Sequence, residues 1–199
     1  MRPAYIPKAF RAFGDGRIGD AAAYKAAALG ASGYPRIEQA VAALPDPLPR
    51  IDPVELQGCA AATVGHALAQ FMRINELTPI VVSPRARAEL ASTSAVAVRY
   101  AILHDAFHVL LGFDASWPGE LGVWSFVAAQ RYSPAFARAA ALARWFYPLI
   151  APSQRAELKR QAARGLTLAK GATCLICSPI EHCWRMPLVD VRRQFGLDS

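Results

Sequence analysis

Alanine accounts for 40 of the 199 residues, and this excess constrains the fold more than any other feature of the sequence. Alanine is the strongest helix former and is depleted in strands. Only Ile80-Val81-Val82 resembles a strand, and three residues are too few to build a sheet. Hydrophobic residues make up 54% and charged residues 19%, which excludes disorder as the main state. We therefore predict an all-α fold, a single-domain bundle of about seven to eight helices.

Three helix starts share one signal, a capping side chain followed directly by proline, at Asp52-Pro53, Ser83-Pro84 and Ser133-Pro134. The side-chain oxygen can accept a hydrogen bond from the first turn, and proline fits the first helical positions. Glycine marks two helix ends, at Gly112 and Gly196. The predicted helices span residues 20–29, 37–44, 52 to 72 or 75, 93–111, 118–131, 134–149, 153–163 and 180–194.

The first fifty residues differ from the rest because glycine and proline punctuate them. Asp20 is the expected cap of the first helix, and residues 44–50 form an extended linker, since each proline pushes its predecessor out of the helical region. We expect residues 1–50 to be a helical segment that packs on the same domain as residues 51–199.

The sequence also indicates in which compartment, and with which partners, the protein is expected. No stretch reaches about 18 uninterrupted apolar residues, so a membrane-spanning helix is not expected. Residues 1–13 lack the apolar core of a secretory signal, and the four cysteines do not follow the pattern of a small secreted domain. The net charge of +7 would suit an anionic membrane surface or nucleic acid, but no nucleic-acid-reading motif is present, so we predict no nucleic-acid partner.

The candidate metal-binding or catalytic residues lie in one segment, His104-Asp105-x-x-His108, which eleven intervening residues separate from Glu120. On a helix the two histidines lie about 40° apart, and Asp105 falls about 60° from His108. Gly112 then ends the helix, and Glu120 opens the next one. Burying two imidazoles and two carboxylates among apolar neighbours is costly unless they are paired. A divalent cation would offset that cost; zinc and ferrous iron both accept these ligands, and a satisfied polar network is the alternative.

This motif resembles the signature of the Coq4 family of ubiquinone-biosynthesis proteins, in its bacterial branch. The blocks that resemble the family are Thr63–Met72, Arg99-Tyr100, Gly112-Phe113-Asp114, Gly119-Glu120-Leu121, Gln130, and Glu181 through Trp184, Pro187-Leu188 and Val191-Arg192. Together they cover roughly residues 50–197. Two departures stand out: residues 101–103 are apolar where relatives carry polar side chains, and His66 replaces a usual arginine.

The resemblance implies a mostly helical protein that dimerises and lies peripherally on the membrane, on the inner face of the cell membrane or the matrix side of the mitochondrial inner membrane. His104, Asp105, His108 and Glu120 would hold a divalent metal ion, zinc or alternatively iron. The implied reaction replaces the C1 carboxyl of a polyprenylated benzoate ring with a hydroxyl, an oxidative decarboxylation. The implied partners are the prenylated ring or another isoprenoid lipid, an anionic membrane surface and other quinone-biosynthesis proteins.

A mechanism consistent with these residues uses the metal as a Lewis acid on the substrate carboxylate or ring hydroxyl. Asp105 or Glu120 would serve as general base. Two other functions compete with this enzyme. One is a non-catalytic lipid-binding scaffold that organises quinone-biosynthesis enzymes around a structural metal. The other is an HD-type phosphohydrolase, which shares the His-Asp dipeptide but needs an upstream His and a distant Asp as further ligands.

Three further features have mainly structural interpretations. Cys174-x-x-Cys177 and His182-Cys183 favour core packing over a second metal or redox site, since Cys59 is distant. The cluster Trp145–Ile150 fits a core or dimer interface, or alternatively a surface that faces lipid. The surplus of arginine and lysine fits a solvated face or contact with anionic headgroups; it comprises Arg85, Arg87, Arg155, Lys159, Arg160, Arg164, Arg192 and Arg193.

Overall fold

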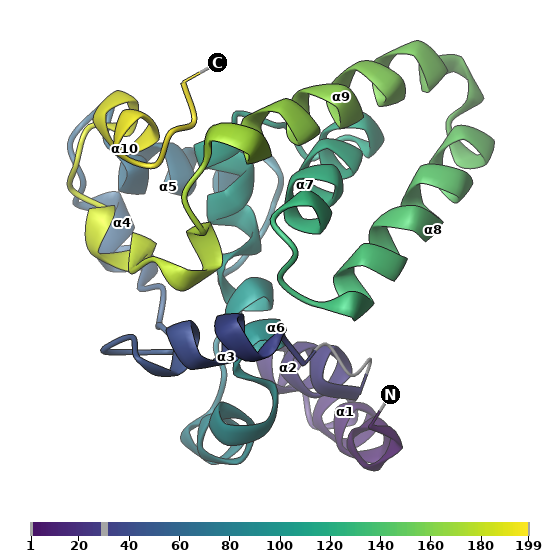
Figure 1. Cartoon of the computed structure of the whole chain (residues 1–199). Helices are drawn as coiled ribbons and strands as arrows, with labels where there is room; N and C mark the ends of the chain where they lie inside the picture. Colours follow the sequence, from purple (N-terminus) through teal and green to yellow (C-terminus); the bar gives the residue numbers. More distant parts are fainter. Residues whose placement is uncertain (1, 29–31, 199) are drawn as a thin grey trace.

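The computed structural model describes residues 2–28 and 32–198, and within them it contains ten α-helices, four short 3₁₀ helices and no β-strand (Figure 1). The α-helices are α1 (Ile6–Gly14), α2 (Ile18–Ala28), α3 (Pro35–Ala42), α4 (Pro53–Gln57), α5 (Val64–Ile74), α6 (Pro84–Leu111), α7 (Trp117–Ala129), α8 (Pro134–Ile150), α9 (Arg155–Gly171) and α10 (Leu188–Gln194). The 3₁₀ helices are Pro3–Tyr5, Pro152–Gln154, Leu175–Cys177 and Ile180–Cys183. The all-α class is confirmed, whereas the predicted number of helices is too low.

The predicted helix signals act as expected. Asp52 accepts a hydrogen bond from the backbone NH of Val54 at 2.9 Å, Ser83 caps α6, and Ser133 caps α8. Gly112 ends α6 in the left-handed conformation, with φ of +69°. Local side-chain chemistry is therefore sufficient to place these helix ends.

Several predicted boundaries are wrong. The helix predicted from residue 52 is two helices, α4 and α5, because Ala62 adopts a φ of +65° and Thr63 caps a new start. The helix predicted over 180–194 is interrupted at Pro187, which precedes α10. Conversely, α6 begins at Pro84 rather than near Thr93, and α9 continues to Gly171.

The N-terminal prediction is also incomplete. Helix α1 was not predicted, and α2 starts at Ile18, so Asp20 lies inside it instead of capping it. Asp20 instead holds the capping residue of α6: its carboxylate accepts hydrogen bonds from the backbone NH and the hydroxyl of Ser83, at 2.7 and 2.9 Å. Residue 29, the predicted end of this helix, lies outside the described residues.

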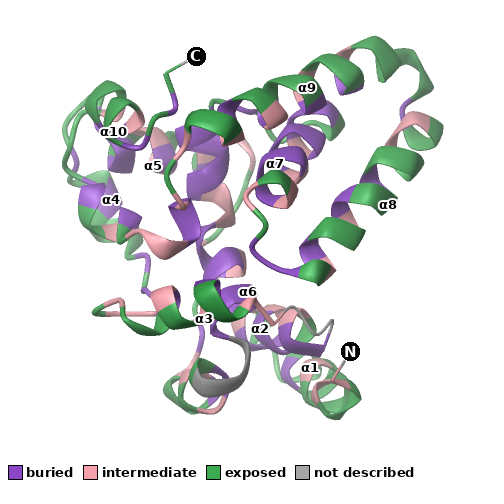
Figure 2. Ribbon diagram, viewed as in Figure 1, coloured by how far each residue is buried: buried purple, intermediate pink, exposed green. Residues whose placement is uncertain are grey.

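Helix α6 is the centre of the fold. Helices α2, α3, α5, α7 and α10 all pack against it, and Figure 2 shows much of its length buried. Leu90, Leu103 and Phe107 are fully buried along it. The helix that carries both histidines is therefore held from several sides.

Helices α7, α8 and α9 form a second layer beside α6 (Figure 1). Gly165 lets the backbone of α9 pack closely against the backbone of α7, since a Cβ at this position would lie 2.2 Å from the carbonyl oxygen of Gly122 on α7. A small buried cluster joins the three helices through Leu121, Ala143, Leu158 and Ala162.

The outer face of α8 is exposed. Trp145 is 70% exposed, and Phe146, Leu149 and Ile150 are also exposed. The interpretation of this cluster as core is therefore wrong, and the surface interpretations remain. None of the described helices is both long and apolar enough to cross a membrane.

Candidate functional site

The candidate site lies between α6 and α7. His104 and His108 are one helical turn apart near the C-terminal end of α6, and Glu120 is in the first turn of α7. The connecting loop is tightly built: Asp114 accepts hydrogen bonds from the backbone NH and hydroxyl of Ser116, which in turn caps α7. This loop turns the chain back so that α7 presents Glu120 to both histidines.

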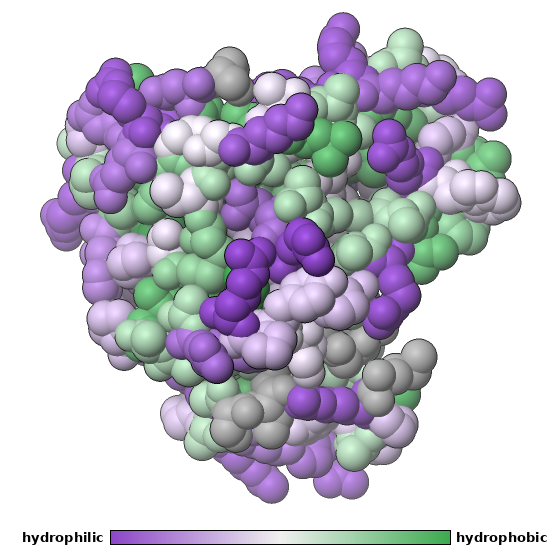
Figure 3. Space-filling model, in the orientation of Figure 1, coloured by the Kyte–Doolittle hydropathy of each residue, from purple (hydrophilic) through white to green (hydrophobic). Residues whose placement is uncertain are grey.

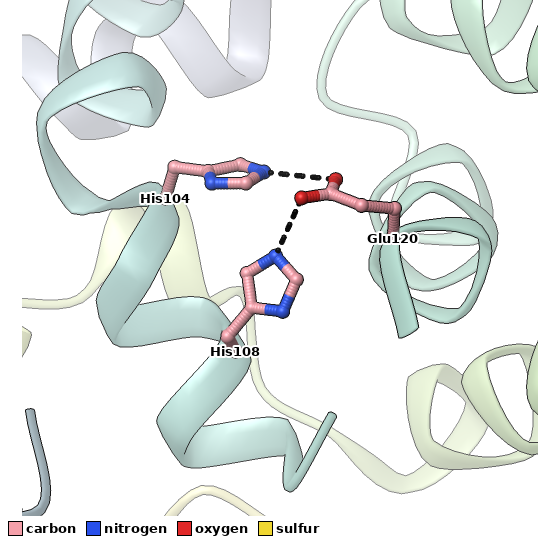
Figure 4. A group of neighbouring side chains, drawn as sticks. All are labelled: His104, His108 and Glu120. Carbon is pink, nitrogen blue, oxygen red and sulfur yellow. Dashed lines mark ion pairs between the residues drawn. The ribbon is translucent and has the colours of Figure 1, made fainter. Parts of the chain in front are cut away.

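Figure 4 shows the two imidazoles pointing at the Glu120 carboxylate. The Nε2 atom of His104 lies 3.5 Å from one carboxylate oxygen, and the Nε2 atom of His108 lies 3.3 Å from the other. Taking one donor atom from each residue, all three lie within 4.8 Å of one another. The structure thus brings together three of the four predicted ligands.

The orientation of His108 is fixed by the loop. Its Nδ1 atom lies 2.9 Å from the carbonyl oxygen of Asp114, and a carbonyl only accepts hydrogen bonds, so Nδ1 carries a proton. Gly119 leaves room for this carbonyl, since a Cβ there would lie 2.0 Å from it. The Nε2 atom of His108 is buried and makes no hydrogen bond, although the Glu120 carboxylate is 3.3 Å away.

His104 is held between two carboxylates. Its Nδ1 atom lies 3.4 Å from Oδ1 of Asp105, while Nε2 faces Glu120. Burial would lower the pKa of His104, but Asp105 and Glu120 outweigh burial and raise it to about 9. Burial would likewise raise the pKa of Glu120, but the two histidines lower it to about 2. Without a metal the site is therefore an ion-paired cluster at neutral pH.

Asp105, the fourth predicted ligand, lies outside the three-residue cluster. It contacts the ring nitrogen of His104 that points away from Glu120. Carboxylates in this position commonly orient a metal-bound histidine and strengthen it as a ligand. The departure at residues 101–103 thus leaves both histidines with polar partners, Asp105 for His104 and the Asp114 carbonyl for His108.

The cluster fits a divalent metal ion. Zinc bonds of about 2.0–2.1 Å at tetrahedral angles separate the donor atoms by roughly 3.4 Å. The observed nitrogen–oxygen separations, 3.5 and 3.3 Å, agree with this value, whereas the three donor atoms together lie within 4.8 Å of one another, so a bound ion would draw the two imidazoles closer together. A cation would also satisfy the buried Nε2 of His108, which has no hydrogen bond. Two imidazoles and one carboxylate suit zinc or ferrous iron.

Metal affinity should depend on pH, because the metal must displace the proton of His104. Since the pKa of His104 is about 9 in the metal-free protein, lowering the pH below 9 should weaken zinc binding about tenfold per pH unit. Zinc titration against a competing chromophoric chelator at pH 6.5, 7.5 and 8.5 measures this slope. Asp105→Asn removes a carboxylate that raises the pKa, so its slope should flatten. Equal affinities of the unsubstituted protein at all three pH values would contradict the assignment.

Arginines from distant segments secure the end of α6 that carries the site. Arg164 of α9 donates to the carbonyls of Leu111 and Gly112, and Arg192 of α10 donates to those of Val109 and Leu110. A helix leaves its last four carbonyls without intrahelical partners, and cations there also favour the helix dipole. Both arginines were predicted as part of a solvated or lipid-binding face; Arg164 is exposed and Arg192 half-buried, and their bonds to the end of α6 were not predicted.

An apolar cavity of about 290 Å³ opens beside the cluster. His104 and Asp105 of α6 contribute polar side chains to its lining, and Tyr100 of α6 and Trp124 of α7 add aromatic rings. The remaining wall comes from α2, residue 80 and α8, through Ala26, Ile80, Ala135, Phe136 and Ala139. The cavity can therefore accept an apolar molecule and bring one end of it to His104.

The cysteines lie outside this site. A disulfide joins Cys174 and Cys177, which the sequence did not predict, while Cys59 and Cys183 are free and buried. Within the described residues none of the four belongs to the cluster of His104, His108 and Glu120 that could hold a metal ion. That cluster also lacks the upstream His and distant Asp of an HD-type phosphohydrolase, which counts against this alternative.

Comparison with known proteins relates the chain to one family. Residues 48–199 match the model of the family described as coenzyme Q (ubiquinone) biosynthesis protein Coq4. The mitochondrial ubiquinone biosynthesis protein COQ4 homologue of Xenopus laevis is 28% identical over 153 residues, which is 74% of this chain and 51% of that protein. The homologue from Danio rerio is 28% identical over 158 residues, 75% of this chain and 56% of that protein. The chain thus spans about half the length of these relatives.

A solved structure shares the fold. The crystal structure of a protein from Nostoc punctiforme PCC 73102 assigned to ubiquinone biosynthesis superposes with a TM-score of 0.64 at 20% identity, covering 82% of this chain and 81% of that one. At this identity the likeness concerns the fold alone. The family match includes α6, α7 and the whole His104–Glu120 cluster. The chain therefore belongs to the Coq4 family of coenzyme Q (ubiquinone) biosynthesis proteins.

Proposed function

We propose that this protein is a metal-dependent enzyme of ubiquinone biosynthesis that replaces the C1 carboxyl of a polyprenylated benzoate ring with a hydroxyl. The observation that carries the proposal is the convergence of His104, His108 and Glu120 beside an apolar cavity, which His104 also lines. A site for this reaction needs charge stabilisation beside a space for a hydrophobic ring, and the two features meet at His104.

Each residue of the site has its own role in this proposal. His104, His108 and Glu120 would hold the metal, and Asp105 would orient His104. When bound, the metal would supply Lewis acidity toward a carboxylate or phenolate, and iron would add redox chemistry. Asp105 lines the cavity, whereas Glu120 is engaged by both histidines, so Asp105 is the better placed general base. The apolar walls exclude water and strengthen these electrostatic interactions.

The reaction removes the ring carboxyl as carbon dioxide and adds one oxygen atom of dioxygen to the ring. The second oxygen atom leaves as water, and this takes two electrons and two protons from an added reductant. Purified protein, reconstituted with zinc or with ferrous iron, should convert a prenylated 4-hydroxybenzoate to the hydroxylated, decarboxylated product under air in the presence of a reductant such as ascorbate. Mass spectrometry detects the product. Retention of the compound without conversion under either metal would favour the second candidate, a scaffold whose metal is structural. Absence of both binding and conversion would contradict both.

We also propose that the protein works at an anionic membrane surface. Exposed apolar side chains occur on α8, at Trp145, Leu149 and Ile150, and cations Arg138 and Arg144 lie exposed on the same helix. Figure 3 shows apolar surface at the right-hand edge of the molecule, where α8 runs. Large apolar side chains beside cations are typical of interfacial binding to anionic lipids.

The membrane proposal predicts that the protein co-sediments with vesicles that contain anionic phospholipid. Trp145→Ser with Leu149→Ser should lower the partition coefficient at least about tenfold, because each large apolar side chain contributes about 1.5–3 kcal/mol when buried. Val54→Ser, at an equally exposed residue of α4, is the matched control and should bind as the unsubstituted protein does. Unchanged vesicle binding of the α8 variant would contradict the membrane proposal and would indicate that this face contacts protein instead, for example in a homodimer.

The remaining partners follow from the family. We propose that the protein dimerises and contacts other proteins of quinone biosynthesis, and that residues 1–50 form part of the same domain. Two contacts support the last point: α2 packs against α6, and Ala26 of α2 lines the cavity beside His104. The N-terminal segment, which precedes the family match at residue 48, therefore helps to build the candidate site.

A further inference from the structure

The hairpin of α1 and α2 carries an exposed apolar groove of about 500 Å³. Four large apolar side chains line it, and they are exposed to solvent by large fractions: Phe10 74%, Phe13 66%, Ile18 60% and Ile6 40%. Alanines of both helices and Lys25 complete the lining. Contiguous exposed apolar surface of this kind marks a binding surface, because keeping such side chains in water is costly.

The sequence of α1 explains why these side chains gather on one side. Ile6, Phe10 and Phe13 follow the three- and four-residue spacing of a single helix face. Helix α1 packs on α2, and α2 packs on α6, so the hairpin is attached to the body of the protein. Lys8 of α1 also pairs with Glu89 of α6. The groove is therefore part of the folded structure.

The unpaired charges around the groove are positive. The chain up to the end of α2 contains five cations and two carboxylates. The carboxylates, Asp15 and Asp20, both pair with Arg17, at 2.8 and 2.5 Å. Arg11 and Lys25 are exposed, and within the described residues neither makes an ion pair. Aromatic rings beside unpaired cations match an anionic lipid surface, which accepts the rings in its apolar layer and the cations at its phosphates.

The groove lies close to the candidate site. Ala22 of α2 lines the groove, and Ala26, one turn further along the same helix, lines the cavity beside His104. Helix α8, which carries the other exposed apolar surface, lines that cavity as well. In Figure 1 the hairpin and α8 both lie to the right of α6. Two of the helices that wall the cavity thus belong to exposed apolar surfaces.

We propose that the α1–α2 groove docks onto an anionic lipid bilayer, and that it does so together with α8, so that one bilayer contacts both surfaces. This inference rests on the proposed membrane association, because it takes the α8 face as a lipid contact. It adds the N-terminal segment, which precedes the family match at residue 48, as a second contact. The cavity beside His104 would then lie next to lipid, from which an apolar ligand can enter it.

Co-sedimentation of the protein with vesicles of phosphatidylcholine mixed with phosphatidylglycerol tests the groove. Phe10→Ser with Phe13→Ser should lower the partition coefficient at least about tenfold, because two large apolar side chains lose their burial in lipid. Val54→Ser with Ile74→Ser is the matched control: it removes two similarly exposed side chains, on α4 and α5, and should bind as the unsubstituted protein does. Circular dichroism and thermal unfolding should be unchanged in both variants, since all four side chains are mainly exposed.

A second variant tests the charges at the groove. Arg11→Gln with Lys25→Gln should lower binding to the mixed vesicles roughly tenfold, because each cation near an anionic surface strengthens binding. Binding to vesicles of phosphatidylcholine alone should not change. An equal loss on both kinds of vesicle, or no loss on either, would contradict the match between these cations and anionic lipid.

The shared bilayer is tested by combining the Phe10→Ser and Phe13→Ser changes with Trp145→Ser and Leu149→Ser of α8. If one bilayer contacts both surfaces, the two losses multiply and the vesicles stay dispersed when the unsubstituted protein binds. If the surfaces bound different bilayers, the protein would cross-link vesicles, and light scattering would rise. Cross-linking would therefore overturn the shared contact.

Three outcomes separate the groove from the membrane proposal. Unchanged vesicle binding of the Phe10→Ser, Phe13→Ser variant, with a loss only in the α8 variant, would overturn the groove and leave the membrane proposal intact. A changed oligomeric state of the groove variant with unchanged vesicle binding would show that the groove contacts a second copy of the chain. Failure of the unsubstituted protein to bind either kind of vesicle would contradict both proposals.

Discussion

Replacing His108 with alanine should abolish stable metal binding and, with it, conversion of the prenylated ring. His108 provides a buried nitrogen that is oriented by the Asp114 carbonyl and faces Glu120. Even loss of a partner that merely orients a ligand costs about 10–100-fold in metal affinity, so loss of the ligand itself should cost at least about a hundredfold. Metal analysis by mass spectrometry after dialysis should show about one ion per chain in the unsubstituted protein and almost none in the variant.

The fold of the His108→Ala variant should survive, because alanine is the strongest helix former and α6 is held from several sides. Circular dichroism and a cooperative thermal transition check this. His182→Ala is the matched control, since His182 is exposed and outside the cluster. Full metal content and activity in His108→Ala, with the protein folded, would contradict the metal site.

The largest effect on stability is expected at Arg99. Its guanidinium is fully buried and pairs with Glu181 at 2.7 Å, while it also donates to the carbonyls of Ile176 and Ser178, at 2.9 and 2.7 Å. Arg99→Met would leave the Glu181 carboxylate and these carbonyls buried without their donor. Removing one partner of a buried ion pair costs about 3–5 kcal/mol, and urea-induced unfolding should show a loss of this size.

An exposed ion pair serves as the comparison for the buried pair of Arg99. Arg193→Met removes the pair between Arg193 and Asp190, whose side chains are more than half exposed, and should cost less than about 1 kcal/mol. Arg99→Lys should also be destabilising, because an ammonium cannot reproduce the forked contacts of the guanidinium. If Arg99→Met were as stable as Arg193→Met, the network would not be what fixes residues 176–181 against α6.

The helical class was predictable because its causes are local. Alanine content, the Ser-Pro and Asp-Pro starts, and the glycine end at Gly112 act within one or two turns of the chain. The break at Ala62 and the role of Asp20 were not predictable in this way. Asp20 bonds to the capping residue Ser83, which lies 63 residues later, so its partner is set by how α2 packs on α6.

The candidate site was likewise predictable where its causes are local and unpredictable where they are not. The spacing of His104, His108 and Glu120 predicted that they meet, because helix geometry and a short loop determine it. The side on which Asp105 contacts His104 depends on a side-chain rotamer, which spacing does not specify. Arg164 and Arg192 bond to the end of α6 from segments more than fifty residues away, so only the folded chain reveals their role.

The most direct test of the central claim uses a prenylated 4-hydroxybenzoate labelled with carbon-13 in its carboxyl group. The protein should be assayed under air with a reductant such as ascorbate, after removal of metal and again after reconstitution with zinc or ferrous iron, with His108→Ala as control. We expect labelled carbon dioxide and an equal amount of the hydroxylated ring, only from the reconstituted unsubstituted protein. Equal release of labelled carbon dioxide by metal-free protein or by His108→Ala, or no release under any condition, would contradict it.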